Sequence, residues 1–513
     1  MKPLGTITNC FPFLEDEISS ELESLMGEAL NYADFLDRVV KHILENESPP
    51  MMVFYAISQL HEKEWSKYLE SVLERYQNHR LLQPFIMMDK LSLDEATTTD
   101  VLESANLVLR TASNLWIQFE MHYLRFLCAS TYSLGSALEE EALDRLQSLI
   151  DSEPKMEFLQ PRVVIEKASR LLLAGKVSDA IRLNELGIAQ AQSFDDIYLL
   201  SYAYARQAYC LRHFDSAKAL EMLDRVKEIW NTLGFDAEEH WGYCNIRHSV
   251  HNPRGEFDLS LQYLQRAIKI REAHRTHTSL RALPLNMTYV YAELEDGENA
   301  LEWAKMAMAN PQFMSGEPGN MALALIRLAR AFALLGDIEQ AEKYLEKSET
   351  ESLKVGIDRN IAENYIVTGH IERAKGELES AMFHFERGLE IAEQVNHQNR
   401  INSCLIGLVK TEIDLLEVDE TSALLNTSGP WMRLLQSEVE RKELPGIRGV
   451  LLLLKAELRL KQGRMEEAGS LLEDIRSLAE NPGLGYLGRK AEKLQSIIEL
   501  EALNRKKRVK SSF

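Results

Sequence analysis

Hydrophobic residues recur every three or four positions along most of the chain, in pairs of segments joined by a short glycine turn. In "MALALIRLARAFALLGD", Leu325, Leu328, Ala329 and Phe332 share one side of a helix, and Gly336 follows at its end. A second segment with the same spacing comes after the glycine. The pattern therefore predicts a helix, a short turn and an antiparallel second helix.

This hairpin pattern returns about every 40 residues, with steps between 39 and 45 residues. The second helix carries a small residue five places after the start of each turn, at Ala180, Ala219, Ser260, Ala300, Ala341, Ala381, Ala423 and Ala468. The first helix carries another, seven places before the turn, at Ala168, Ala208, Thr288, Ala329, Gly369 and Ala456. Small residues on both helices allow close packing, and one hairpin cannot bury both apolar stripes alone. The spacing predicts an all-α fold of stacked hairpins.

Two hairpins carry a recognisable motif. "LARAF" (328–332) is followed by "AEKYL" (341–345), and "TGHIE" (368–372) by "AMFHF" (381–385). This resembles the tetratricopeptide repeat over about residues 105 to 500, although the spacing exceeds 34 residues and the first-helix Trp and closing Pro are mostly absent. The longer spacing is similar to that of kinesin light chains and MalT-like bacterial regulators. The resemblance implies a right-handed α-solenoid (superhelix) whose first helices line a concave groove.

The ends of the chain are less regular. Residues 1–100 fit the repeat poorly, and the helix in "NYADFLDRVVKHILENES" is stopped by Pro49 and Pro50, so we expect a helical cap or small bundle there. Residues 101–500 are predicted to form about eight to nine hairpins, and residues 501–513 a basic tail. The tail's cations suit either a polyanion-binding patch or, the reading we favour, a solvated helix end.

Charge and cysteine usage narrow the class of protein. The net charge of −21 argues against nucleic-acid binding over the main body. The five cysteines, Cys10, Cys128, Cys210, Cys244 and Cys404, are widely spaced, which is typical of a reducing compartment. No apolar stretch is long enough for a signal peptide or a membrane span, so we expect a cytoplasmic protein that does not bind membranes. The oligomeric state is left open.

No nucleotide-binding, zinc-protease or hydrolase motif occurs, and we predict neither catalysis nor a cofactor. The best metal candidate is "HWGYCNIRHSVH", with His240, Cys244, His248 and His251. On a helix His240 and His248 would lie ~12 Å apart along the axis, too far to share one ion. Because His248 takes the small first-helix position, we expect a locally irregular repeat and no metal.

In the resembled family, residues just after the first-helix small site face the groove; here they are Ser169, Tyr209, Ser249, Tyr289, Arg330, His370, Glu412 and Glu457. Arg212 and Arg373 lie about one helical turn after Tyr209 and His370. The candidate partner-binding set, from the middle of the superhelix, is Tyr209, Arg212, Tyr289, Arg330, His370 and Arg373. Arg and Tyr suit a peptide with acidic and apolar side chains. No lysine stands three residues before the small site, so the family's carboxylate clamp is not expected.

The sequence therefore predicts a non-catalytic scaffold that binds a peptide or helix of an unidentified partner protein in its concave groove. The alternative is a ligand-sensing regulatory module of MalT-like type that acts in trans. A small molecule alone would stabilise such a sensor, whereas a scaffold would respond to a peptide.

Overall fold

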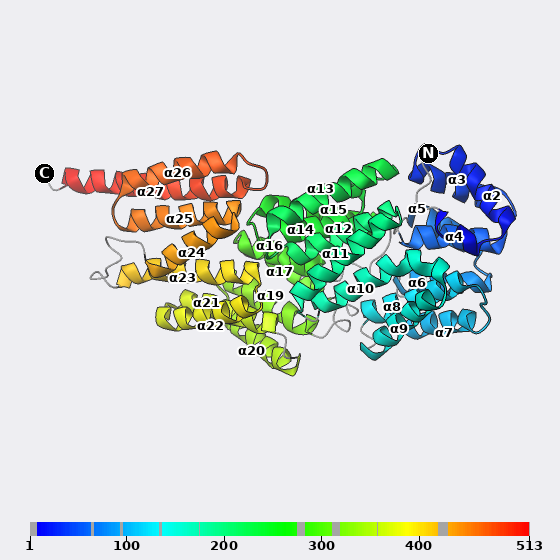
Figure 1. The fold of residues 1–513 in the computed structure, drawn as a ribbon. Helices are drawn as coiled ribbons and strands as arrows, with labels where there is room; N and C mark the ends of the chain where they lie inside the picture. Colours follow the sequence, from blue (N-terminus) through cyan, green and yellow to red (C-terminus); the bar gives the residue numbers. More distant parts are fainter. Residues whose placement is uncertain are drawn as a thin grey trace. The chain divides into compact units, whose positions relative to one another are not determined.

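In a computed structural model of the chain, the described residues are 8–62, 66–92, 96–132, 136–173, 175–273, 283–309, 319–355, 358–418 and 429–511. Across these ranges the regular secondary structure is entirely helical, without a strand (Figure 1). The all-α prediction is confirmed. No helix in this part of the chain has the length and apolar character needed to cross a bilayer.

The chain forms two compact units. Unit 1 comprises Met1–Leu211, Ala217–Ile246 and Arg266–Leu280, and unit 2 comprises Arg212–Ser216, Arg247–Gln265 and Arg281–Phe513. The boundaries predicted at residues 100 and 500 stay predictions.

The helices of unit 1 alternate along the chain with short connections. They are α2 (Asp16–Gly27), α3 (Tyr32–Glu45), α4 (Pro50–Glu62), α5 (Ser66–Arg75), α6 (Gln83–Ser92), α7 (Thr98–Leu109), α8 (Leu115–Tyr132), α9 (Ser136–Ser152), α10 (Gln160–Leu173), α11 (Val177–Ser193), α12 (Ile197–Leu211) and α13 (Ser216–Leu233). Short 3-10 turns are η1 (Phe11–Phe13), η2 (Arg80–Leu82), η3 (Pro154–Leu159) and η4 (Ala237–Glu239).

Helices α14 (Trp241–His251) and α15 (Phe257–Ala273) contribute to both units. Unit 2 continues with α16 (Leu283–Glu293), α17 (Gly297–Met308), α19 (Asn320–Leu334), α20 (Ile338–Val355), α21 (Asp358–Lys375), α22 (Leu378–Gln394), α23 (Gln398–Val418), α24 (Pro430–Lys442), α25 (Pro445–Lys461), α26 (Met465–Ala479) and α27 (Gly485–Ser511).

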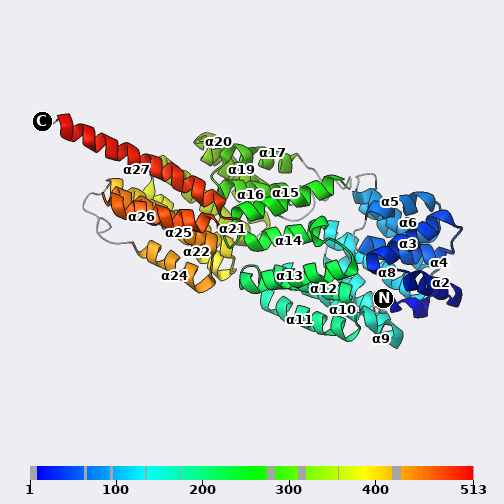
Figure 2. The ribbon, with the colours of Figure 1, turned by 90° about the horizontal axis from the view of Figure 1, so that it is seen from above.

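Successive helices form packed hairpins, as the spacing predicts. The pairs α8–α9, α10–α11, α16–α17, α19–α20, α21–α22 and α25–α26 pack closely, and α11–α12, α17–α19, α22–α23 and α26–α27 join one hairpin to the next. Both views show α25, α26 and α27 lying side by side (Figures 1 and 2).

The small residues occupy the contacts inside the hairpins. Ala329 and Ala341 have no exposed surface, and neither do Ala300, Ala381 or Ala468. Ala423, predicted for the same position, lies outside the described residues. A larger side chain at any of these sites would push the two helices apart. The small residues therefore recur about every 40 residues because two backbones approach closely in each hairpin.

The glycine turns use the conformation that glycine tolerates best. Gly336 and Gly376 follow α19 and α21 with φ of 78° and 83°, in the left-handed region where other residues are strained. Each chain reversal is therefore fixed locally, and the second helix returns along the first.

Unit 2 contains a contact between residues about 190 positions apart. The backbone N–H of Gly446, at the start of α25, donates to the carbonyl of Arg254, in the turn between α14 and α15, at 2.9 Å. The Tyr486 hydroxyl of α27 donates to the carbonyl of Gly255 at 3.0 Å. A Cβ on Gly446 would lie 2.0 Å from the Gly255 oxygen, so only glycine fits. These contacts join the turn between α14 and α15 to α25 and α27.

Candidate functional site

The described part of unit 2 contains a cavity of about 550 Å³ between successive first helices. α16, α19, α21, α23 and α25 each contribute to its wall, as does α27, which follows the last hairpin. The lining residues are Phe257, Ala292, Glu293, Glu295, Arg330, Ala333, Leu334, His370, Arg373, Ala374, Ser403, Ile406, Lys410, Asp414, Val450, Glu457 and Lys490. Its volume is in the range of sites that hold small ligands or a few peptide residues.

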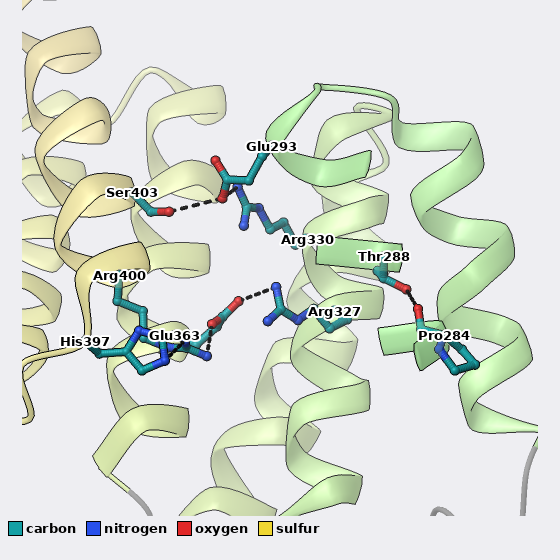
Figure 3. Close-up of polar contacts among 9 residues, drawn as sticks. All are labelled: Pro284, Thr288, Glu293, Arg327, Arg330, Glu363, His397, Arg400 and Ser403. Atoms are coloured by element: carbon teal, nitrogen blue, oxygen red, sulfur yellow. Dashed lines mark hydrogen bonds and ion pairs between the residues drawn. The ribbon is translucent and has the colours of Figure 1, made fainter. Parts of the chain in front are cut away.

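Ion pairs hold most of the charged wall in place. Arg330 lies 2.8 Å from Glu293, which also accepts a hydrogen bond from Ser403 at 3.1 Å (Figure 3). Arg373 lies 2.6 Å from Asp414. Because the two residues of each pair come from different helices, these ion pairs connect neighbouring hairpins of the stack.

Glu295 joins three parts of unit 2. Its carboxylate lies 2.7 Å from Lys410 of α23 and 3.3 Å from Lys490 of α27. Partial burial acts to raise the pKa of Glu295, but the two ammonium groups outweigh it and hold the pKa well below its usual range. Glu295 therefore stays ionised at neutral pH.

Glu457 differs from the other carboxylates of the wall. It is half-buried on α25, and no hydrogen bond or ion pair reaches its side chain from the residues that the structure describes. Burial raises its pKa above the ordinary value of 4.5; Lys410 opposes the shift and Glu295 reinforces it. The cavity thus contains one acid that is partly desolvated without a close cation.

His370 is a neutral group of the same wall. Burial, followed by nearby Arg330 and Lys410, lowers its pKa well below 6.5. The imidazole packs edge-on against Phe385, with ring centroids 5.0 Å apart. At neutral pH it offers hydrogen-bonding nitrogens without adding charge.

Beneath this wall lies a buried network of charged side chains (Figure 3). Glu363 lies 2.8 Å from Arg327 and 2.6 Å from Arg400, and the three residues expose 1%, 6% and 6% of their surface. Burial lowers the pKa of Arg327 to about 10 against the attraction of Glu363. The Arg327 guanidinium also lies 4.5 Å from the ring centre of Tyr289. The network fixes the relative positions of α19, α21 and α23.

In unit 1 the space around the starts of α8, α10 and α12 is filled by side chains. Arg162 of α10 lies 2.9 Å from Glu120 of α8 and 3.7 Å from the ring centre of Tyr123. The hydroxyls of Tyr123 and Tyr202 both donate to Glu166, at 2.9 and 3.0 Å. The cavity found beside this cluster has only about 30 Å³, enough for a water molecule.

The structure brings together part of the predicted partner-binding set. Arg330, His370 and Arg373 line the unit 2 cavity, and Tyr289 is buried beside Arg330, whose guanidinium lies 5.6 Å from its ring centre. Tyr209 lies half-buried on α12 in unit 1. Arg212, directly after α12, is half-buried in unit 2. Neither is among the cavity-lining residues.

On α23 the residues that line the cavity differ from the sequence expectation. The prediction placed Glu412 in the groove, whereas Lys410 and Asp414 line the cavity. Glu412 is buried and accepts a hydrogen bond from the backbone N–H of Trp431 at 3.2 Å. The connection from α23 to α24 is longer than the turns inside the other hairpins of unit 2, so the register that holds in those hairpins did not apply to α23. The spacing Ser403, Ile406, Lys410 and Asp414, three or four residues apart, is the signal that would have found the right one.

Side chains of the segment 240–251, the metal candidate of the sequence, contact other groups of the protein. His248 is buried and its Nδ1 lies 2.7 Å from the hydroxyl of Ser260, so a histidine replaces the small residue of the first helix and contacts the small residue of the second. His251 lies 2.7 Å from Glu256, and the Cys244 thiol donates to the carbonyl of Glu238 at 3.4 Å. Among the described residues, no three His, Cys, Asp or Glu side chains are grouped to hold a metal ion.

A family comparison identifies one hairpin. Residues 322–351, which contain most of α19 and α20, match the family described as tetratricopeptide repeat. This hairpin is thus similar to a tetratricopeptide repeat. The match includes Ala329 and Ala341, the pair of small residues from which the repeat was predicted. The similarity to MalT-like regulators and kinesin light chains stays a prediction.

The chain is also similar to several solved structures. A Rap protein complexed with Competence and Sporulation Factor is 15% identical over 67% of this chain and 99% of its own, with a TM-score of 0.45. NprR in complex with its cognate peptide NprX is 17% identical over 67% and 99%, with a TM-score of 0.46. Aspartyl phosphate phosphatase F from Bacillus subtilis is 12% identical over 73% and 96%, with a TM-score of 0.36. No curated protein sequence matches this chain.

Proposed function

We propose that unit 2 is a non-catalytic binding module that holds a short, extended peptide segment of a partner protein in its cavity. The observation that carries the proposal is the wall itself, to which five first helices and α27 contribute. Seven apolar residues line it: Phe257, Ala292, Ala333, Leu334, Ala374, Ile406 and Val450. An α-helix with its side chains is about 10–12 Å across, so a cavity of 550 Å³ suits an extended chain better.

The polar groups of the wall suit binding rather than catalysis. The Ser403 hydroxyl donates to Glu293, a carboxylate already held by Arg330. Activating a serine nucleophile would require a base that takes the hydroxyl proton. Glu293, the carboxylate that faces this hydroxyl, is instead paired with the guanidinium of Arg330.

Filling the cavity tests the proposal. Ala374 is exposed and lines the cavity, so Ala374→Trp occupies the space with little strain on the fold. The full chain, immobilised, is offered a random library of N-acetylated, C-amidated dodecapeptides at pH 7. We expect the wild-type chain to enrich a set of peptides, and Ala374→Trp to lower their recovery at least about tenfold, equivalent to ~1.4 kcal/mol.

The matched control is Ala309→Trp, at the exposed end of α17 and away from the cavity-lining residues. It should recover the same peptides as wild type. Equal recovery by Ala374→Trp and wild type, or no enriched peptide at all, would refute the proposal. A thermal shift with a small metabolite and none with peptides would support the ligand-sensing alternative.

A further inference from the structure

The charges of the cavity wall do not balance locally. Four cations line it, Arg330, Arg373, Lys410 and Lys490, and each lies within 3.3 Å of a carboxylate of the wall. Those carboxylates are Glu293, Asp414 and Glu295. Glu457, the fourth acid of the wall, has no cation within ion-pair distance among the described residues.

We infer that Glu457 receives the side-chain cation of a lysine or arginine in the bound peptide. The inference rests on the proposed function and names the chemistry of its ligand. It differs from the acidic peptide expected from the sequence, since Arg330 and Arg373 already hold carboxylates of the protein. An acidic peptide would have to displace these carboxylates, whereas a cationic one pairs with Glu457, which has no ion-pair partner among the residues that the structure describes.

Burial makes this unmatched carboxylate an effective anchor. Removing part of its hydration costs free energy, and no close ion pair from the described residues returns it. The raised pKa of Glu457 records that cost. A guanidinium or ammonium that enters the cavity restores a charge-assisted hydrogen bond where solvent screening is reduced.

The surroundings favour a long side chain over a peptide terminus. Val450 stands two helical turns before Glu457 on α25, and Ile406 and Phe257 also line the cavity. The methylene stem of lysine or arginine packs on such surfaces while its charged end reaches a polar group. A terminal amine would bring the polar backbone against these apolar residues, so we assign the site to a side chain.

The same random library tests this assignment, because its peptides are acetylated and carry no terminal amine. We expect lysine or arginine to be enriched at one position of the peptides recovered by wild type, by about tenfold over the library. Glu457→Gln should lose that enrichment, and Glu457→Lys should replace it with aspartate or glutamate at that position. Glu473→Gln, on the exposed surface of α26, should leave the wild-type preference intact.

The outcomes separate the two proposals. Peptides recovered through the cavity, but without a lysine or arginine preference or with one that survives Glu457→Gln, would overturn the role of Glu457 and leave peptide binding standing. Equal recovery by wild type and Ala374→Trp would overturn both. Circular dichroism of each variant shows that the helices remain formed.

Discussion

Units 1 and 2 are both built from pairs of packed helices, but side chains fill the space between the first helices of these pairs differently in the two units. In unit 1 large side chains such as Trp116 and Tyr198 surround the Glu120–Arg162 pair, and the cavity beside them has about 30 Å³. In unit 2 the open space lies toward the ends of α19 and α21, where Ala333 and Ala374 line a cavity of about 550 Å³. Small residues between the helices therefore allow the stack to form, and the small side chains of Ala333 and Ala374 leave room for a site in unit 2.

The largest effect should come from the buried charges under the open site. Glu363→Gln removes the carboxylate between Arg327 and Arg400 and leaves two guanidinium groups buried without it. We expect the free energy of unfolding to fall by about 3–5 kcal/mol, measured by urea unfolding. Glu386→Gln, exposed on α22, should change it by less than about 0.5 kcal/mol. Similar small changes for both would show that the network does not support unit 2.

A smaller effect is expected at the closing contact of unit 2. Gly446→Ala places a methyl group against the carbonyl oxygen of Gly255, and overpacking of this kind costs about 1–3 kcal/mol. The control is Gly469→Ala on α26, where an added Cβ meets no atom within 4 Å. That change should stabilise the helix by about 0.5–1 kcal/mol. Destabilisation by the control and not by Gly446→Ala would contradict the contact.

In unit 1 the polar side chains between first helices are predicted to be structural only. The Tyr202 hydroxyl donates to Glu166 and accepts from Arg206 at 3.0 Å. Tyr202→Phe should therefore lower the free energy of unfolding by about 1–2 kcal/mol and leave peptide recovery unchanged. A loss of recovery, with stability intact, would place peptide binding in unit 1.

The smallest effect concerns the pH dependence of stability. Since the pKa of Glu457 is raised in the folded chain, folding favours its protonated form. As pH rises from 4.5 toward neutral, ionisation of this group reduces the stability of wild type but not of Glu457→Gln. The variant should be slightly more stable at pH 7, with the advantage disappearing below pH 4.5. Parallel stability profiles across this range would contradict the shift.

The sequence predicted the features that depend on local spacing. Ala329 with Ala341 defines a hairpin because both positions must be small for two adjacent backbones to touch. The same register placed Arg330, His370 and Glu457 on the inner surface, where the structure has them. The register failed at Glu412, on a helix that is followed by a longer connection. The sequence also does not reveal with which carboxylate each arginine forms an ion pair.

Long-range contacts were beyond prediction for a different reason. The fit of Gly446 against Gly255 depends on the curvature accumulated over several hairpins, which no local pattern records. Likewise, Glu457 is distinguished by the absence of a cation within ion-pair distance among the described residues, and that depends on where the cations of α21, α23 and α27 lie. The repeat pattern thus predicts which residues line a groove, but it does not predict which of their charges has no ion-pair partner.

Amide hydrogen exchange of the full chain, with and without a peptide recovered from the library, tests the central claim most directly. We predict slower exchange in α19, α21, α23 and α25, which line the unit 2 cavity, and unchanged exchange in α8, α10 and α12 of unit 1. Protection confined to unit 1, or no protection in any of the four cavity helices at saturating peptide, would contradict it.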